Sequence, residues 1–186
     1  MATVEEGAAL LTAEEFAKRA DSGMVEELAR GRIVMSPPPG FDHGVVCNTV
    51  GRLLGTFVAD RDLGRVLNND SGVITERRPD SVRGPDVSYY SYARVPRSGR
   101  PTGYAAALPE LVFEVLSPSD RWNRVVAKAA EYVEAGVSIV VLLDPRERKA
   151  HVFEADRAPV ALGPDDVLRL ESVLPGFEAV VGDLFG

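Results

Sequence analysis

A carboxylate inside an apolar run is the first feature of this sequence that could do chemistry. Glu114 lies within residues 111–116, LVFEVL, a run typical of a central strand that is covered on both faces. Burying an ionised carboxylate is costly unless a cation or a hydrogen-bond donor lies beside it. Because perturbed buried acids cluster at functional sites, Glu114 is predicted to belong to one. The alternative is a structural glutamate paired with an arginine.

A second carboxylate, Asp86, follows Pro85 and directly precedes another expected strand, residues 87–90. An aspartate there is by itself more often a turn or cap residue. Together with Glu114 it could share one Mg²⁺, since this ion takes oxygen ligands and keeps several waters. Such an ion polarises a phosphoryl oxygen and lowers the pKa of bound water. The pair therefore predicts a site for Mg²⁺ or Mn²⁺.

Four further residues are candidates for the same site. Lys128 lies about two turns into the helix expected after Glu114, with Tyr132 one turn on. The chain has three lysines against eighteen arginines, which favours a specific need for a compact charge at Lys128. The alternative is a surface lysine with its stem on the protein. Glu27 in an early strand and His43 at a helix entry are candidate outer members, or else a surface acid and a helix-entry histidine.

Several other kinds of site are excluded or disfavoured. Ser117 lacks the glycines of a nucleophile elbow, and no Gly-rich phosphate-binding loop is present. The single cysteine, Cys47, excludes an internal disulfide and a cysteine zinc cluster. Two histidines, His43 and His151, are too few for a His-rich metal site. A metal is therefore expected to be a hard cation held mainly by carboxylates.

Length and composition indicate one soluble domain. The chain has 186 residues, of which 45% are apolar and 26% charged. No apolar run approaches the ~20 residues of a membrane span. The first residues, MATVEEGAALLTAEEF, lack the early basic residues of a secretory signal, so a cytoplasmic location and no membrane partner are expected.

Charge is distributed unevenly along the chain. The net charge of −7 argues against a protein that coats nucleic acid through bulk charge. Residues 52–100, however, carry nine arginines against six acids. A basic face and arginines scattered over a solvated surface are both compatible with this count.

The expected elements alternate between strands and helices. A capping box of Thr12 and Glu15 opens a helix to about Ala20, and apolar spacing predicts a long helix from about residue 42 that ends at Gly64. A third helix follows a Ser117–Asp120 entry sequence, with Ser117 as a helix cap, and closes at Gly136. Strands are expected at residues 24–28, 32–35, 65–67, 71–75, 87–90, 111–116, 139–143 and 149–153, then short edge strands. Residues 111–143 form a βαβ unit with a right-handed crossover.

Five segments together resemble the Uma2 family of restriction endonucleases, within the PD-(D/E)XK nuclease superfamily. They are GRIVMSPPP before His43, RGPDVSYY with Asp86, PELVFEVLSPSD with Glu114, the pair Lys128 and Tyr132, and GVSIVVLLDP. The resemblance covers residues 11–185. It implies an α/β restriction-endonuclease-like fold, with a mixed central sheet flanked by helices, in a single domain over residues 1–186.

The resemblance also implies roles for residues. Asp86 matches the PD aspartate, Glu114 the second acid, and Glu27 the acid of the segment written here EELARGR. The superfamily's lysine two residues after the second acid is replaced here by Leu116, and Lys128 is expected to take its place.

The implied activity is Mg²⁺-dependent (or Mn²⁺-dependent) hydrolysis of DNA phosphodiester bonds. Asp86, Glu114 and the Val115 carbonyl would hold the metal, and Lys128 would orient or activate the attacking water. Glu27 would position a water or a second ion, and the arginines of residues 77–100 would hold phosphates. A homodimer is expected, with residues 46–58 and 94–104 as contact surfaces. The alternative is a module on the same fold that binds DNA or protein with weak or no catalysis.

Overall fold

The structure, a computed structural model, describes residues 10–19 and 22–186. Residues 1–9, which include most of the segment considered above as a signal sequence, lie outside the described residues. Its helices are α1 (Ala13–Phe16), α2 (Phe41–Asp60), α3 (Trp122–Ala135) and the 3-10 helix η1 (Val181–Phe185). None of the helices in the described ranges combines the length and the apolar character needed to span a lipid bilayer.

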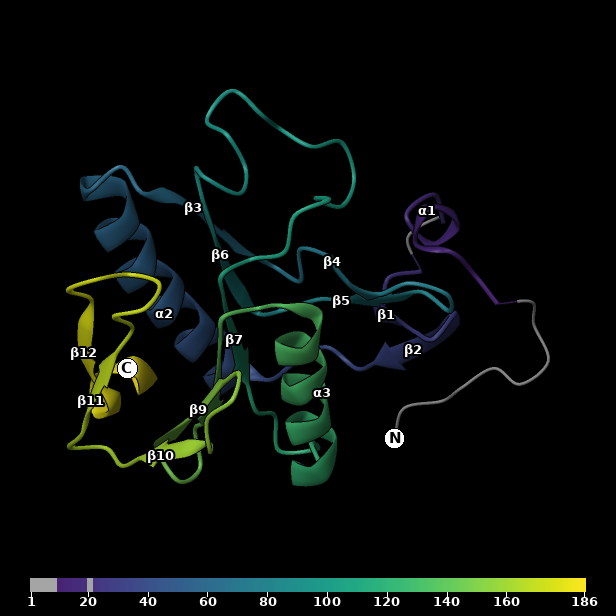
Figure 1. Cartoon of the computed structure of the whole chain (residues 1–186). Helices are drawn as coiled ribbons and strands as arrows, with labels where there is room; N and C mark the ends of the chain where they lie inside the picture. The colour runs from purple at the N-terminus through teal and green to yellow at the C-terminus, as the bar shows by residue number, and fades with distance from the viewer. Residues whose placement is uncertain (1–9, 20–21) are drawn as a thin grey trace.

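A six-stranded mixed sheet forms the centre of the molecule (Figure 1). Its strands, in spatial order, are β10 (Val160–Leu162), β9 (Lys149–Glu154), β8 (Ile139–Asp144), β7 (Leu111–Val115), β6 (Val87–Ser91) and β3 (Gly64–Asn68). β7 and β8 are parallel and are joined through α3, while the other neighbours are antiparallel. The predicted βαβ unit is therefore confirmed.

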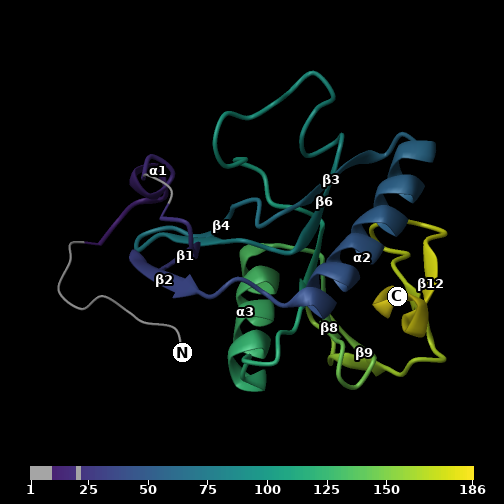
Figure 2. The ribbon, with the colours of Figure 1, turned by 180° about the vertical axis from the view of Figure 1, so that it is seen from behind.

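Helices α2 and α3 cover opposite faces of this sheet (Figures 1 and 2). Along β7, Leu111, Phe113 and Val115 pack in the core on the α2 side, whereas Val112 packs on the α3 side. Because side chains alternate along a strand, Glu114 shares the face of Val112 and points toward α3. The apolar run LVFEVL is thus a strand buried on both faces, as predicted.

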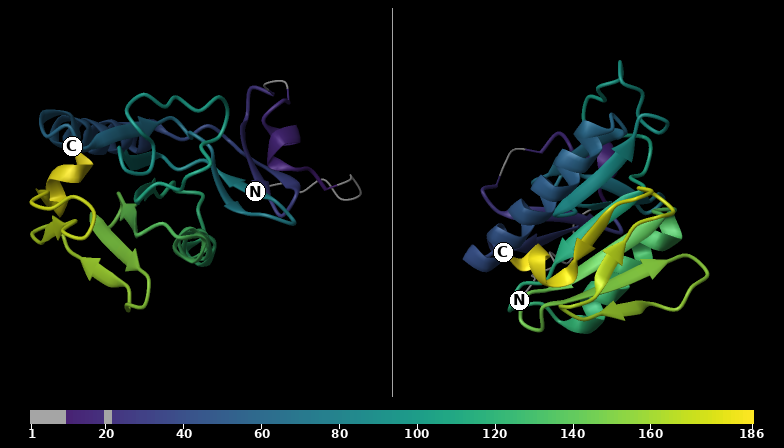
Figure 3. Two further views of the ribbon diagram at one scale, coloured as in Figure 1. Left: turned by 45° about the horizontal axis from the view of Figure 1, so that its top comes forward. Right: turned by 90° about the vertical axis from the view of Figure 1, so that its left-hand side faces the viewer.

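A second, four-stranded antiparallel sheet stands beside the first, on the side away from the C-terminal segment (Figure 3). Its spatial order is β2 (Arg32–Ser36), β1 (Val25–Ala29), β5 (Ser81–Arg83) and β4 (Val73–Glu76). The short strand β5 was not predicted. It directly precedes Gly84 and Asp86, so it brings the second sheet to the end of β6.

The ends of the helices correct three expectations. α2 ends at Asp60, and Gly64 begins β3, where a Cβ atom would collide with the carbonyl oxygen of Tyr90. α1 ends at Phe16, well before the predicted Ala20, which lies outside the described residues. α3 begins at Trp122, and Ser117 instead forms a preceding turn in which its N–H donates to Asp120.

The α2 surface differs from the sequence expectation, and the C-terminal segment adds to the core. The apolar face of α2 is buried against the sheet of its own chain through Val46, Val50, Leu54 and Val58, so it is not free to form a dimer contact. The C-terminal segment contains the expected short strands, among them β11 (Val167–Arg169) and β12 (Glu178–Val180), and its apolar side chains also pack in the same core. Residues 92–110 form an extended loop at the far end of β6 (Figure 1).

Candidate active site

Asp86 is fixed at the end of β7 by a main-chain hydrogen bond. It lies one residue before β6, whose Val87 is opposite Phe113 of β7. The N–H of Val115 donates to Asp86 Oδ2 at 2.6 Å. The two predicted acids therefore project from neighbouring strand ends. Val115 contributes its N–H to this arrangement, and metal binding through its carbonyl stays a prediction.

Lys128 reaches the same place from α3. Its Nζ lies 2.8 Å from Glu114 and 2.8 Å from Glu27, and 3.4 Å from the Gly84 carbonyl oxygen. The right-handed crossover lays α3 back over the sheet, so a residue two turns into the helix returns to the level of Glu114. The predicted position of Lys128 beside the second acid agrees with this geometry. The ammonium bridges two carboxylates from different sheets.

Glu114 is enclosed by α3. Its side chain is 10% exposed, and the Tyr132 hydroxyl donates to Oε1 at 2.9 Å. Tyr132, fully buried, thus closes the site from one side, as expected from its place one turn after Lys128. The acid is paired with a lysine, in contrast to the arginine pairing considered for a structural glutamate.

Burial dominates the electrostatics of this pair. Burial raises the pKa of Glu114 to about 8. The positive charge of Lys128 lowers this pKa, whereas the negative charges of Asp86 and Glu27 raise it. Burial lowers the pKa of Lys128, but the charges of Glu114 and Glu27 outweigh it and hold that pKa above its usual range. Lys128 is therefore a permanent cation, and Glu114 changes its charge close to neutral pH.

A second ion-pair network holds Glu27 in place. Glu27 accepts hydrogen bonds from Arg83 at 3.1 Å and from the N–H of Gly84 at 3.0 Å. Arg83 also binds Glu131 of α3 at 2.8 Å. Burial raises the pKa of Glu27, but Lys128 and then Arg83 outweigh it and lower that pKa below its usual value. The network ties β1, β5 and α3 together around one charged Glu27.

Replacing Arg83 with alanine is expected to lower the free energy of unfolding by about 3–5 kcal/mol, because it leaves two partly buried acids, Glu27 and Glu131, without their common partner. Chemical denaturation measures the change. Arg30→Ala is the matched control, since Arg30 is 78% exposed in its ion pair with Glu76 and should change stability by less than ~1 kcal/mol. Equal effects of the two substitutions would contradict a structural role for the Arg83 network.

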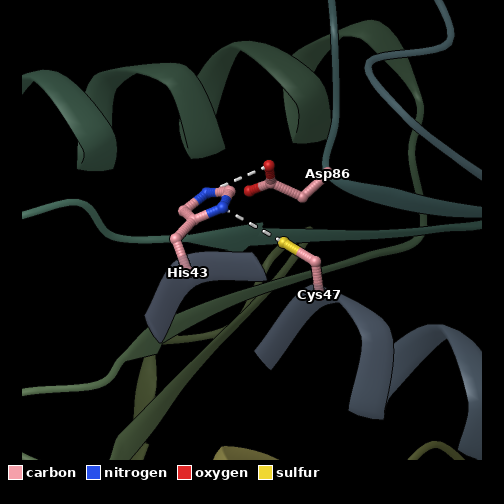
Figure 4. A group of neighbouring side chains, drawn as sticks. All are labelled: His43, Cys47 and Asp86. Atoms are coloured by element: carbon pink, nitrogen blue, oxygen red, sulfur yellow. Dashed lines mark hydrogen bonds and ion pairs between the residues drawn. The ribbon is translucent and has the colours of Figure 1, made fainter. Parts of the chain in front are cut away.

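His43 reaches Asp86 from the first turn of α2 (Figure 4). Its Nε2 lies 3.2 Å from Asp86 Oδ1, and its Nδ1 lies 3.3 Å from the Cys47 sulfur. Burial lowers the pKa of His43, but the hydrogen bond and charge of Asp86 outweigh it, so the net shift is upward. The predicted outer position of His43 therefore corresponds to direct contact with Asp86.

Sequence reasoning missed four residues near the site: Cys47, Asp70, Arg83 and Glu131. Asp70 follows β3 and lies against Gly84, where a Cβ atom would meet the Asp70 Cβ at 2.9 Å. Partial burial and then the charge of Asp86 raise the pKa of Asp70. A signal for Asp70 exists in the pair Asn69–Asp70, since both adopt positive φ and mark a tight turn. Glu131 could have been found by its helical spacing from Lys128.

The arginines expected to form a basic face are mostly engaged within the chain. Arg77 contacts Glu14 and Asp80, Arg94 contacts Glu110, and Arg97 contacts Asp62. With Arg83, this accounts for four of the six arginines in residues 77–100. Arg78 and Arg100, the other two, are exposed; Arg78 lies in the turn between β4 and β5, and Arg100 lies in the loop of residues 92–110.

A family model with the description "Putative restriction endonuclease" matches residues 13–182. The chain belongs to the Uma2 family. A comparison with curated proteins gives no match.

A solved structure supports the fold. The Uma2 chain is similar to a crystal structure described as "a putative nuclease belonging to DUF820" from Anabaena variabilis, with a TM-score of 0.83 and 21% sequence identity. The match covers 94% of this chain and 97% of that one. The expected α/β fold with a mixed sheet flanked by helices is therefore confirmed.

Carboxyl groups outnumber basic side chains at the site of this Uma2 protein, and Glu114 adds its negative charge as the pH rises through its pKa of about 8. Within the described residues, five carboxylates (Glu27, Asp70, Asp86, Glu114 and Glu131) surround two permanent cations, Lys128 and Arg83. An unbalanced cluster of partly buried carboxylates favours the binding of a cation. The arrangement can therefore hold a divalent ion next to a fixed ammonium.

A groove of about 370 Å³ opens beside the site. It runs from His43 and Leu116 to Arg146, between the start of α2 and the start of α3. Two aromatic side chains line it, Phe41 at 86% exposure and Trp122 at 44%. The groove therefore reaches the site at His43 and presents two exposed aromatic surfaces.

Proposed function

We propose that this protein is a Mg²⁺- or Mn²⁺-dependent endonuclease that hydrolyses DNA phosphodiester bonds. Its membership of a family described as restriction endonucleases supports a nuclease function in general. Restriction-endonuclease-like proteins generally use divalent metals. The observation that carries the proposal for this chain is the position of Lys128, whose Nζ lies between Glu114 and Glu27 beside the Asp86 strand end.

Asp86 and Glu114 would hold the metal, with the Val115 carbonyl as a third ligand. These acids come from adjacent strand ends, and the Val115 N–H fixes the orientation of Asp86. Oxygen ligands of this kind suit Mg²⁺ or Mn²⁺. When bound, such an ion polarises the phosphoryl oxygen and lowers the pKa of a bound water.

The other residues would act on the attacking water and on the developing charge. Lys128, held as a cation by its two acids, would orient the water and stabilise negative charge on the phosphoryl group in the transition state. Glu27, kept ionised by Lys128 and Arg83, would accept a hydrogen bond from a water or hold a second ion. Tyr132 keeps Glu114 in place, and His43 orients Asp86 from the other side.

DNA is the proposed partner, and the groove that carries Phe41 and Trp122 is the proposed path of the strand. Arg146 in that groove would contribute a phosphate contact, whereas none of the arginines of residues 77–100 lines it. A homodimer is part of the proposal because cleavage of a duplex requires two cuts. The loop of residues 94–104 is the contact surface that remains after α2 is excluded.

Asp86→Asn is expected to reduce plasmid nicking in Mg²⁺ or Mn²⁺ by at least ~10²-fold, because the amide keeps the acceptor for the Val115 N–H but loses the charge that holds the ion. Nicking is followed by conversion of supercoiled to open-circular DNA. Asp165→Asn is the matched control, since Asp165 is an exposed aspartate outside the site.

The alternative function is a module that binds DNA without cleaving it. Such a reading is supported by Leu116 at the position of the superfamily's strand lysine and by the arginines already paired within the chain. It predicts no nicking by the wild-type protein in either metal, together with retention of DNA in a mobility-shift assay. Wild-type nicking that Asp165→Asn keeps and Asp86→Asn loses would exclude it.

A further inference from the structure

The two carboxylate oxygens of Asp86 face different partners. Oδ2 accepts the N–H of Val115, while Oδ1 contacts His43, which in turn contacts Cys47. We propose that His43, Cys47 and Asp86 form a binding site for a thiol-preferring divalent cation, Zn²⁺, distinct from the position between Asp86 and Glu114.

The ligand atoms are close enough to share one ion. A ring nitrogen of His43, the Cys47 sulfur and a carboxylate oxygen of Asp86 all lie within 4.8 Å of one another. His43 faces its two neighbours with different ring nitrogens: Nδ1 lies 3.3 Å from the Cys47 sulfur, and Nε2 lies 3.2 Å from Asp86 Oδ1. A tetrahedral Zn²⁺ with bonds of ~2.0–2.3 Å places its ligand atoms about 3.3–3.8 Å apart. Since only one ring nitrogen of His43 would bind the ion, side-chain rotation must shorten the longest separation by up to about 1 Å.

The backbone brings the three ligands together on rigid elements (Figure 4). His43 and Cys47 are four residues apart on α2 and therefore share one face of that helix. Asp86 is fixed opposite them by its bond to Val115. Two ligands from one helical turn and one from a strand end form a preorganised site.

The donor set distinguishes the ion from the one proposed for the nuclease. Thiolate and imidazole ligands favour Zn²⁺, whereas Mg²⁺ prefers oxygen ligands. Three protein ligands leave the fourth tetrahedral position for a water, as in open zinc sites. His43 lines the groove beside α2, which gives that position a path to solvent.

The same contacts could be read as a Cys–His–Asp nucleophile. Burial, and then the negative charge of Asp86, raise the pKa of the Cys47 thiol well above its usual range, so the free thiolate that such catalysis needs is disfavoured. A bound Zn²⁺ reverses this balance by bonding directly to sulfur. Binding then releases the thiol proton to solvent, and no oxidation or reduction takes place.

Asp86 is a ligand in both the proposed Zn²⁺ site and the proposed Mg²⁺ site. Bound Zn²⁺ would therefore leave the Mg²⁺ site without one of its carboxylate ligands. This consequence rests on the proposed nuclease function, whereas the Zn²⁺ site itself does not. Zn²⁺ is then expected to inhibit cleavage supported by Mg²⁺. Removing the sulfur ligand should weaken the inhibition without removing either acid.

Titration of the reduced protein with Co²⁺, a spectroscopic substitute for Zn²⁺, tests the site directly. Cys47 is the only cysteine of the chain, so a thiolate-to-cobalt charge-transfer band has one possible source. The wild type is expected to develop this band at one Co²⁺ per chain and to lose it on addition of equimolar Zn²⁺. Cys47→Ser should show no band, and His43→Ala should bind Zn²⁺ at least ~10-fold more weakly.

Two results would overturn the site. One is a wild type with no band, and the other is a band whose Co²⁺ affinity is unchanged in both His43→Ala and Asp86→Asn, which would indicate a lone thiol. Inhibition of nicking by Zn²⁺ is a separate test. For each protein, nicking is expressed relative to its own rate without Zn²⁺. The Zn²⁺ concentration that halves this rate should be at least ~10-fold higher for Cys47→Ser than for the wild type. A charge-transfer band in a wild type that does not nick DNA would support the Zn²⁺ site and contradict the proposed nuclease function.

Discussion

Lys128→Ala is expected to lower the free energy of unfolding of the metal-free protein by about 3–5 kcal/mol, because the buried ammonium is the common partner of Glu114 and Glu27. Plasmid nicking should fall by about 10²–10³-fold. Added Mg²⁺ should restore more stability in this variant than in the wild type, since a cation would relieve unpaired carboxylates. Denaturation with and without Mg²⁺ measures the difference.

Two variants separate charge from geometry. Lys128→Arg should recover part of the stability but little nicking, because a planar guanidinium cannot replace a compact ammonium in this space. Lys149→Ala is the control: this exposed lysine pairs with Glu147 at the surface, and its loss should cost less than ~1 kcal/mol. A Lys128→Ala protein that nicks DNA at the wild-type rate would remove Lys128 from the proposed mechanism.

Glu114→Gln is expected to change how stability depends on pH. The pKa of Glu114 is raised from 4.5 to about 8 in the folded protein, so its contribution is fully present below pH 4.5 and is lost as the pH rises through about 8. Over that window the wild type should lose up to ~1.4 kcal/mol per pH unit relative to Glu114→Gln. Denaturation at a series of pH values, without metal, gives this difference.

Mg²⁺ should oppose this loss in proteins that keep Glu114. Its binding displaces the proton of Glu114, so the increase in melting temperature should be larger at pH 8 than at pH 6, and much smaller in Glu114→Gln. His43 and Asp70 also have raised pKa values, but both variants share them and they largely cancel in the comparison. Glu134→Gln, an exposed substitution on α3, is the control. Parallel pH curves for all three proteins would show that Glu114 does not titrate in this window.

The sequence was sufficient to predict the centre of the fold and the position of Lys128. Residues 111–143 contain two buried strands that are mostly apolar, with a helix between them that is bounded by turn and glycine signals. This local pattern determines a crossover of known handedness. Once β7 and α3 are placed, helical spacing brings Lys128 and Tyr132 over Glu114. These positions depend on periodicity and connection, which a single sequence carries.

The parts that were missed depend on contacts between distant segments. β5 has three residues, too few for a periodic signal, and its place is set by pairing with β1 and β4. Asp70 reaches the site because the turn after β3 packs on Gly84. Counting residues excluded metal sites made of several cysteines or several histidines, but Cys47, His43 and Asp86 form a mixed set that only the fold assembles.

The four-stranded sheet and the six-stranded sheet should differ in the free energy that local unfolding requires. The four-stranded sheet supplies Glu27 and Arg83, yet the apolar cluster beneath it has Ala13, Leu28 and Val82 as its buried members, against a far larger core around α2. Regions with few buried apolar contacts open at lower free energy than the global transition. Amide hydrogen exchange in β1 and β5 should therefore be faster than in β7 and β8. Each local unfolding of the four-stranded sheet would move Glu27 and Arg83 away from the site while the rest of the protein stays folded.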